Sequence, residues 1–345
     1  MGRGPPARRT LTSVAGSGAR PAEVESDIVD AGLYGPGTEA WRLNREAMLL
    51  LGAGPRALLL QLAHPLVAEG VDQHSNFRDD PWARLAATLR SYLRIVYGTI
   101  ASARGEIQRL NELHNAVRGP VTDPSARARH GARYSARDPE LSLWVHATLV
   151  DSTMVAYDAW LEPLPRERRA AFYAETLAVG QAFGIPEAIL PPDLAAFDAY
   201  LEAMLAPDGP VEVGDLAREL GGAVLAPPLG PALAALGDAE IAGHDLRPAV
   251  GAILDALPAA AYRWLLWPSI GLLPASVRQG YHLRWGPVER AVSAWLVTSW
   301  KAWRPLLPAG FRQMPQALAA DRRVGPPVGG APLLGELARA LPHGS

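Results

Sequence analysis

The segment DPELSLWVHATLVDSTMVAYDAWLEPL is apolar on nearly every face of the helix that its pattern predicts. Asp138 and Pro139 form a helix start signal, and the apolar pattern continues to about Leu161. A helix with apolar residues on all sides is stable only when other elements surround it. We therefore expect a central helix at 138–161, with the rest of a large domain packed around it.

Helical periodicity also covers most of the remaining chain. Thr38 begins a helix predicted to end at Leu51, and Pro55, at a favoured first-turn position, begins one predicted to end near Glu69. Further helices are predicted over 80–98, 104–118, 165–183, 191–205, 212–223, 245–257, 258–267 and 287–303. A polar, arginine-rich loop is expected at about 120–137, and no alternating β-branched pattern is long enough to build a sheet. The predicted fold is all-α.

Composition supports a single large helical domain. The 345 residues are 49% apolar and 20% charged, which is enough for a substantial core. We expect a disordered N-terminal arm at 1–25, the helical domain at 26–322 and a loose Gly/Pro-rich tail at 323–345. The longest apolar stretch is interrupted by Gly54, Pro55 and Arg56, so it predicts buried helices and no transmembrane segment. No apolar run of an export signal follows Arg8–Arg9, and the expected location is cytoplasmic.

Several classes of function are excluded by residue content. The 33 basic and 35 acidic side chains leave no strong positive field, so no nucleic-acid partner is expected. The absence of cysteine excludes disulfides, iron–sulfur clusters, a thiolate-bound haem and a cysteine nucleophile. GAGP lacks the lysine of a phosphate-binding loop, and neither G-x-S-x-G nor H-E-x-x-H occurs. The chemistry therefore has to rest on histidines, arginines and carboxylates placed on apolar helices.

The segment HPLVAEGVDQHSNF contains two histidines and two carboxylates. His64 and His74 flank Glu69 and Asp72, and such a group could bind a non-haem metal ion. The intervening proline and glycine leave its geometry undefined, and no second cluster supplies the missing ligands. Structural hydrogen bonding is the favoured interpretation, with one of the histidines near a ligand pocket.

The predicted central helix contains one histidine and one aspartate that need an explanation. His146 lies on an apolar stripe, and Asp151 would be costly to bury without a partner. Arg56, Arg84 or Arg118 could neutralise it. The favoured interpretation is a core histidine with a satisfied ring and a buried salt bridge. The alternative places His146 against a cofactor or a substrate.

A second histidine, in RGEIQRLNELHNAVRG, is aligned with an apolar helical stripe. His114 follows Ile107 on that stripe, a position where a lone histidine is usually structural. Upstream, Arg84 and Thr88 are four residues apart and share one helix face. An arginine, a threonine and a histidine on apolar helices suit a buried anionic cofactor. Haem needs such a site: an imidazole for iron, an apolar slot for the macrocycle and cations for the propionates.

Several motifs then follow one another in a known order. LLLGAGPRALLLQLAHPLVAEGVDQHSNF, RLAATLRSYLRIVYG, LHNAVRG, YSARDPELSLWVHATLVDS and GLLPASVRQGYHLRWGP resemble the family of MpaB-type oxygenases and rubber oxygenases (latex-clearing proteins). That family also includes uncharacterised bacterial proteins. The resemblance extends over about residues 30–320. It implies a single all-α domain with a buried cofactor pocket between core helices, in agreement with the periodicity.

The resemblance also implies a b-type haem, bound through its iron by one histidine and used with O₂. The segment from His114 to Arg118 matches the family's H-x-x-V-R-like sequence, which implies His114 as the iron ligand with Arg118 near the cofactor. Arg84 and Thr88 match an Arg-x-x-x-Thr element close to the haem.

Other candidate residues match family motif positions without a defined role. His64 and His74 are candidates for the cofactor pocket, and His146 is a candidate for the catalytic site. Glu69 and Asp72 are candidates, by position, for a distal acid or base.

The sequence therefore predicts a haem b-dependent oxygenase that acts with O₂ on a small hydrophobic substrate, such as an unsaturated one. Rubber itself is not the expected substrate, because no export signal is recognised. One alternative is a non-catalytic helical protein that binds haem or a hydrophobic ligand. Another is a non-haem metalloenzyme that uses His64 and His74.

Overall fold

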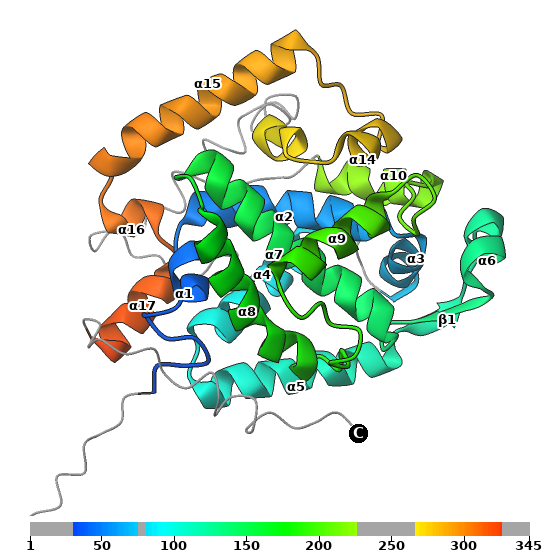
Figure 1. The fold of residues 1–345 in the computed structure, drawn as a ribbon, viewed down its shortest axis with the longest axis horizontal. Coiled ribbons are helices and arrows are strands. Elements are labelled where there is room, and N and C mark those ends of the chain that lie inside the picture. The colour runs from blue at the N-terminus through cyan, green and yellow to red at the C-terminus, as the bar shows by residue number, and fades with distance from the viewer. Residues whose placement is uncertain (1–29, 75–80, 226–265, 326–345) are drawn as a thin grey trace, which may run out of the picture.

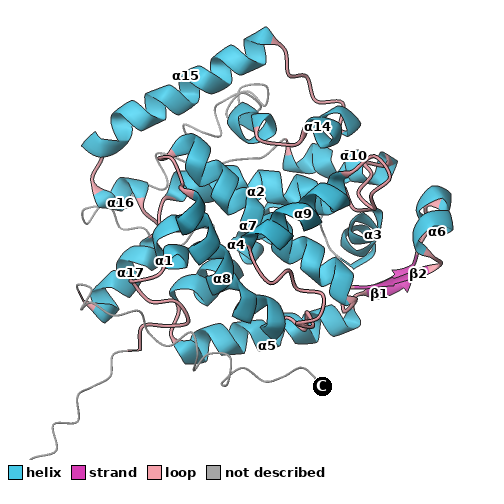
Figure 2. Cartoon of the chain, viewed as in Figure 1, coloured by secondary structure: helices cyan, strands magenta, loops and turns pink. Residues whose placement is uncertain are grey.

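The computed structural model describes residues 30–74, 81–225 and 266–325, and these residues are mostly helical. Figure 2 shows helices throughout, with one short hairpin. The all-α prediction is therefore confirmed, with two three-residue strands as a departure from it. The predicted arm at 1–25, the helix at 245–257, most of the helix at 258–267 and nearly all of the tail lie outside the described residues.

The elements follow one another along the described chain as short and medium helices. They are α1 (Glu39–Leu43), α2 (Ala47–Leu62), α3 (Pro65–His74), α4 (Pro81–Tyr97), α5 (Ile100–Ala116), β1 (Arg118–Pro120), α6 (Pro124–His130), β2 (Arg133–Ser135), α7 (Pro139–Trp160), α8 (Arg166–Ala182), α9 (Leu194–Leu205), α10 (Asp215–Val224), α14 (Ala275–Gly280), α15 (Pro287–Trp303), the 3₁₀ turn η1 (Arg304–Leu306), α16 (Ala309–Arg312) and α17 (Pro315–Val324).

The predicted central helix is α7, which runs through the middle of the molecule in Figure 1. Asp138 caps it, because its carboxylate accepts a hydrogen bond from the backbone N–H of Glu140 (2.9 Å). Trp144, Met154 and Tyr157 lie along its length and are almost fully buried. Helices α2 and α8 pack against it, so its apolar surface is covered as the sequence predicted.

The predicted helix at 38–51 is divided in two. Thr38 caps α1 as expected, accepting a hydrogen bond from the N–H of Trp41 (3.2 Å). The helix ends at Leu43, and the amide of Asn44 donates to the carbonyl of Ala40 (2.9 Å). This side chain competes with the backbone for the helical acceptor, which favours termination at that residue.

The predicted helix start at Pro55 is wrong, because Pro55 lies inside α2. Proline removes one hydrogen bond from a helix interior, and burial of α2 against α7 outweighs that loss. The actual break follows Ala63, where Pro65 begins α3. No single helix among the described residues is long and apolar enough to span a membrane; α2 and α3 meet that test only as a pair bent by 102°.

The predicted salt bridge of Asp151 is confirmed, with Arg56 as the partner. Their side chains approach to 2.7 Å, and the arginine is nearly fully buried. The guanidinium also donates to the hydroxyl of Ser152 (2.8 Å) and to the carbonyl of Leu272 (2.9 Å). The buried charge is therefore both neutralised and hydrogen-bonded, which offsets its desolvation.

The segment expected to be a loop at 120–137 contains structure of its own. Strands β1 and β2 pair antiparallel, with Arg118 opposite Ser135 and Gly119 opposite Tyr134, and they flank α6. Tyr134 of β2 is buried in a small apolar cluster with Leu66 of α3. Three residues per strand are too few to show an alternating pattern, so periodicity could not reveal them.

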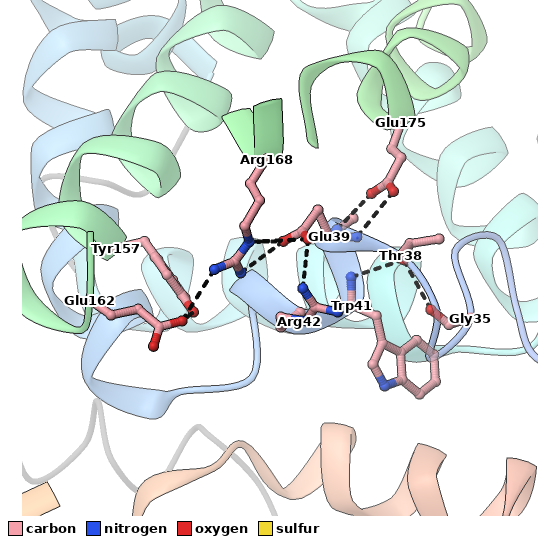
Figure 3. A network of polar contacts seen from close by, with 10 residues as sticks. Gly35, Thr38, Glu39, Trp41, Arg42, Tyr157, Glu162, Arg168 and Glu175 are labelled. Carbon is pink, nitrogen blue, oxygen red and sulfur yellow. Dashed lines mark hydrogen bonds and ion pairs between the residues drawn. The ribbon is translucent and has the colours of Figure 1, made fainter. Parts of the chain in front are cut away.

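Helix α1 is anchored to α8 by a network of polar contacts (Figure 3). The carboxylate of Glu175 accepts hydrogen bonds from the backbone N–H groups of Glu39 (3.0 Å) and Ala40 (2.7 Å). These donors belong to the first turn of α1 and have no partner within the helix. Arg168 forms an ion pair with the side chain of Glu39 (2.9 Å).

The C-terminal helix α17 was not predicted, and it packs beside the N-terminal part of the domain (Figure 1). Asp321 forms an ion pair with Arg45 and accepts a hydrogen bond from the indole of Trp41 (3.3 Å). Arg323 donates to the carbonyl of Tyr97 at the end of α4 (2.8 Å). Its docking depends on these contacts between distant parts of the chain, which local periodicity does not show.

Candidate functional site

The candidate site lies on the hairpin of α4 and α5, which carries Thr88, His114 and position 84. Gly98 and Thr99 join the two helices, and the hydroxyl of Thr99 caps α5 by accepting from the N–H of Ser102 (3.1 Å). The predicted start of this helix at 104 is therefore four residues late. A link this short requires α4 and α5 to run antiparallel and side by side.

A buried carboxylate sets the register of this hairpin. Glu106 of α5 accepts hydrogen bonds from the hydroxyl of Ser91 (2.6 Å) and from the guanidinium of Arg94 (2.8 Å), both on α4. It also forms an ion pair with Arg109. The hydrogen bond from Arg109, together with those from Ser91 and Arg94, lowers the pKa of Glu106 to about 2. The carboxylate therefore stays charged and paired at neutral pH.

This register brings the predicted cofactor residues to one level of the hairpin. Position 84 lies two helical turns before Ser91, and His114 lies about two turns after Glu106. In an antiparallel pair these two displacements point to the same open end. The backbone therefore places position 84 level with His114, and Thr88 lies one turn from position 84 on the same face of α4.

His114 is in the last turn of α5 and is half-buried. The predicted stripe is confirmed and becomes more exposed toward this end: Ile107 is buried, whereas Leu110 and Val117 are half-buried. Next to the histidine, Leu113 is 50% exposed. The open end of the hairpin thus combines an imidazole with one exposed apolar side chain.

The donor set at this end fits a b-type haem. A haem iron binds an imidazole, its macrocycle covers apolar surface, and its propionates take hydroxyl or cationic partners. His114, Leu113 and Thr88 are of these three chemical types, and Thr88 is exposed on the facing helix. Arg118 follows α5 directly, on β1, and its side chain is exposed.

His74 lies at the end of α3, next to β1. Its Nε2 atom is 3.1 Å from the backbone carbonyl of Arg118, and its ring meets Tyr134 edge-on with centroids 6.3 Å apart. A carbonyl can only accept, so Nε2 of His74 has to carry the proton. The side chain is exposed and joins α3 to the hairpin that follows α5.

Glu69, a candidate distal acid or base, has both of its oxygens engaged. The carboxylate is 1% exposed and accepts hydrogen bonds from the backbone N–H groups of Thr122 (2.6 Å) and Asp123 (2.9 Å). The amide of Gln73 donates to it as well (2.7 Å). These contacts hold the β1–α6 connection against α3. Asp72 is half-buried on the same helix.

His146 is not the satisfied core histidine that the sequence favoured. Its Nε2 atom is buried and has no hydrogen-bond partner among the described residues. The ring lies against Gly180 of α8, where a side-chain carbon placed at the glycine would lie 3.4 Å from Nε2. Burial lowers the pKa of His146 to about 4, so the ring is neutral at pH 7.

His64 and His74 do not form a metal site together. His64 precedes α3 and His74 ends it, so about 15 Å of helix separates them. Across residues 30–74, 81–225 and 266–325, no group of three histidine, aspartate or glutamate side chains is placed to hold a metal ion. The metal centre considered as an alternative from the sequence is therefore not assembled in this part of the chain.

The residue that sequence reasoning missed is Glu106. A signal was available, since Glu106 and Arg109 are three residues apart on one helix face. The partner on α4 could not be inferred without the hairpin register, because Ser91 lies on another helix.

The stability of the hairpin should depend on pH through Glu106. Its folded-state pKa of about 2 lies below the ordinary 4.5, so its contribution is complete above pH 4.5 and is lost as pH falls toward 2. We expect Glu106→Gln to lower the free energy of unfolding by about 1–2 kcal/mol at pH 7. This value is smaller than for a fully buried ion pair, because both arginines are about half exposed and water screens their charge. Urea denaturation at a series of pH values from 7 to 2 should show that the difference in unfolding free energy between the wild type and Glu106→Gln decreases as the pH falls.

Glu112→Gln is the matched control, because Glu112 is exposed on the same helix. It should change the free energy of unfolding by less than about 0.5 kcal/mol at any pH. A Glu106→Gln deficit that stays constant between pH 7 and pH 2 would contradict the electrostatic explanation.

Comparison with known proteins matches the chain to a family. The model of the family described as "ER-bound oxygenase mpaB/B'/Rubber oxygenase, catalytic domain" matches residues 41–305. Uncharacterised proteins of Mycobacterium bovis and Mycobacterium tuberculosis are each 30% identical over 153 residues, which is 43% of this chain and 57% of theirs. The chain thus spans little more than half the length of these curated relatives. No solved structure matches it significantly.

The matched range contains every candidate residue, on α3, α4, α5, β1 and α7 and at His64 before α3. It also covers well over half of the chain. The protein therefore belongs to the family of the ER-bound oxygenase mpaB/B' and rubber oxygenase catalytic domain.

Proposed function

We propose that this protein is a haem b-dependent oxygenase that acts with O₂ on a small hydrophobic substrate. Membership of an oxygenase catalytic-domain family supports an oxygenase activity in general. The observation that carries the haem proposal is the register of α4 and α5. It brings position 84 level with the half-buried imidazole of His114, and Thr88 lies one turn further along the same face of α4.

The residues at this end of the hairpin have distinct tasks in the proposal. His114 binds the iron, because it is the imidazole beside an exposed apolar side chain. Thr88 and the arginine at position 84 hold the propionates, and Leu113 contacts the macrocycle. When bound, haem would supply the activation of O₂, and the protein would supply binding and orientation.

Two further groups bear on how the site is maintained. His74 holds the β1 backbone at Arg118 close to α3, which positions the segment that follows the iron ligand. Glu69 holds the next turn of that connection through Thr122 and Asp123. We assign both a positioning role, since their polar atoms already have protein partners.

The test is the absorption spectrum of the full chain, purified after expression with a haem precursor. We expect a Soret band and, after reduction under carbon monoxide, the shifted band of a ferrous adduct. Incubation with squalene as a hydrophobic alkene probe should give O₂-dependent products. Absence of a Soret band from protein-bound haem, after incubation with hemin and removal of unbound hemin, contradicts the haem proposal. A stable Soret band with no O₂-dependent product from any alkene or other hydrophobic probe favours the non-catalytic haem-binding alternative.

A further inference from the structure

A cavity of about 530 Å³ opens on a different part of the molecule from the α4–α5 hairpin. It is enclosed by the α2–α3 junction, the end of α6, the first turn of α7, the segment before α9 and α9 itself, and none of its lining residues belongs to α4 or α5. Its volume is in the range of sites for small organic ligands. The proposed haem site does not account for it.

The most buried polar residue that lines the cavity is a histidine with a defined tautomer. His64 is 4% exposed, and its Nδ1 atom accepts a hydrogen bond from the backbone N–H of Leu66 (3.3 Å). An imidazole nitrogen that accepts has no proton, so in the neutral ring Nε2 carries it. His64 is therefore a fixed hydrogen-bond donor, and its Nε2 is unsuited to bind a metal ion.

Two further polar residues, His130 and Tyr200, line the cavity. Nε2 of His130 and the hydroxyl of Tyr200 are both buried without a hydrogen bond among the described residues. The rings of His64 and His130 lie with centroids 5.3 Å apart. Buried polar groups in native proteins are nearly always hydrogen-bonded. The two atoms are closed off from the open space, so each becomes a partner for a bound oxygen only when its side chain turns toward the cavity.

The charges at the cavity are negative. Asp138 and Glu140 line it from the first turn of α7, and both are exposed. Burial lowers the pKa of His64 to about 3 and also lowers the pKa of His130, so both rings are neutral at pH 7. The adjacent Arg129 forms an ion pair with Glu212 (3.3 Å) and donates to backbone carbonyls. The carboxylates of Asp138 and Glu140 are therefore not neutralised by the two lining histidines, which carry no charge, and Arg129 is paired with another carboxylate.

The rest of the wall is apolar. Leu141 and Leu143 of α7 are buried and line the cavity, and Met204 of α9 lines it as well. An apolar body would cover this surface, with an oxygen atom directed at the buried donors. A carboxylate on the same body would meet two like charges at the entrance.

We propose that this cavity binds an uncharged apolar molecule with a carbonyl or hydroxyl oxygen, which accepts hydrogen bonds from His64 and Tyr200, and that Asp138 and Glu140 exclude anions. The site is independent of haem and of the function proposed for the α4–α5 hairpin. It gives the protein a second binding site, with selectivity set by charge.

The test compares two probes of similar shape that differ in charge: 2-acetylnaphthalene, an uncharged ketone, and 2-naphthoate, an anion. Equilibrium dialysis of each against the full chain gives their dissociation constants. We expect the ketone to bind at least about tenfold more tightly than the anion. Tyr200→Phe should weaken binding of the ketone about three- to tenfold, because one hydrogen bond to its oxygen is lost.

The control for Tyr200→Phe is Tyr157→Phe. It removes a hydroxyl at the far end of α7, about 28 Å along the helix from Asp138, and should leave probe binding unchanged. The double variant Asp138→Asn, Glu140→Gln retains a good helix cap and removes both charges. It should tighten binding of 2-naphthoate while leaving that of the ketone nearly the same.

Three outcomes overturn the proposal. One is equal affinity of the wild-type chain for the ketone and the anion. Another is unchanged ketone binding in Tyr200→Phe, with its unfolding midpoint matching that of the wild type. The third is loss of ketone binding in His114→Ala, which would place the probe in the haem site. If Tyr200→Phe does not fold, failure of the charge-neutral double variant to bind the anion more tightly overturns it instead.

Discussion

Replacement of His114 by alanine is expected to remove the Soret band of the haem-reconstituted protein and its O₂-dependent activity. His114 is the half-buried imidazole at the open end of the α4–α5 hairpin, level with position 84. Loss of a residue that merely supports a metal ligand already costs about 10–100-fold in affinity or activity, and loss of the ligand itself should cost more. Haem titration followed at the Soret wavelength measures the effect.

His282→Asn is the matched control for this substitution. His282 is exposed at the end of α14, and its backbone adopts a positive φ of 54°, a conformation that asparagine tolerates well. This variant should bind haem as the wild type does. Far-UV circular dichroism of both variants separates loss of the ligand from loss of fold.

The His114 assignment fails if His114→Ala folds normally and retains the wild-type Soret band and haem affinity. In that case another imidazole would have to bind the iron. His146 would then be the first residue to test, because its Nε2 atom is buried and has no protein partner among the described residues.

Replacement of Gly52 by alanine should have the largest effect on stability. Gly52 lies in α2 where this helix crosses α7, and a methyl group there would lie 1.4 Å from a ring atom of Trp160. The indole is 4% exposed, so it has no space into which to move. We expect the free energy of unfolding to fall by about 4 kcal/mol or more, which urea denaturation monitored by tryptophan fluorescence would measure.

Gly105→Ala provides the control in the interior of another helix, α5. Gly105 is exposed, and no atom lies within 4 Å of a side-chain carbon placed there. Because alanine favours a helix interior over glycine, this variant should be about 0.5–1 kcal/mol more stable than the wild type. Equal effects of the two substitutions would show that helix propensity, and not the contact with Trp160, determines the stability of α2.

Much of the fold was predictable because it depends on local patterns. The start signal at Asp138 and the all-round apolar pattern located α7 to within a residue at each end. The same reasoning predicted a charge partner for Asp151, because a buried carboxylate needs one, and the structure selects Arg56 from three candidates. These features follow from helical geometry and the cost of burying charge, which act within a segment.

The boundaries that failed are those where tertiary contacts outweigh a local signal. Pro55 would begin a helix in isolation, but the packing of α2 on α7 carries the helix through it. Helix α17 has weak local signals and is held by Arg45 and Trp41 from the other end of the chain. Such contacts join residues more than 270 positions apart, and no window of sequence contains both partners.

In the candidate site, too, some features follow from local patterns and others depend on tertiary contacts. Sequence periodicity placed His114 on an inward-facing stripe and put Arg84 and Thr88 on one face of a second helix. Whether the two faces meet depends on Glu106, whose hydrogen bonds to Ser91 and Arg94 align α4 with α5. Likewise, His64 and Tyr200 come to one cavity because α9 folds back over the start of α7. The chain's local pattern assigns each side chain to a face of its helix, but which faces come together is set by long-range packing, because burial and pairing energies are gained only when the helices are in contact.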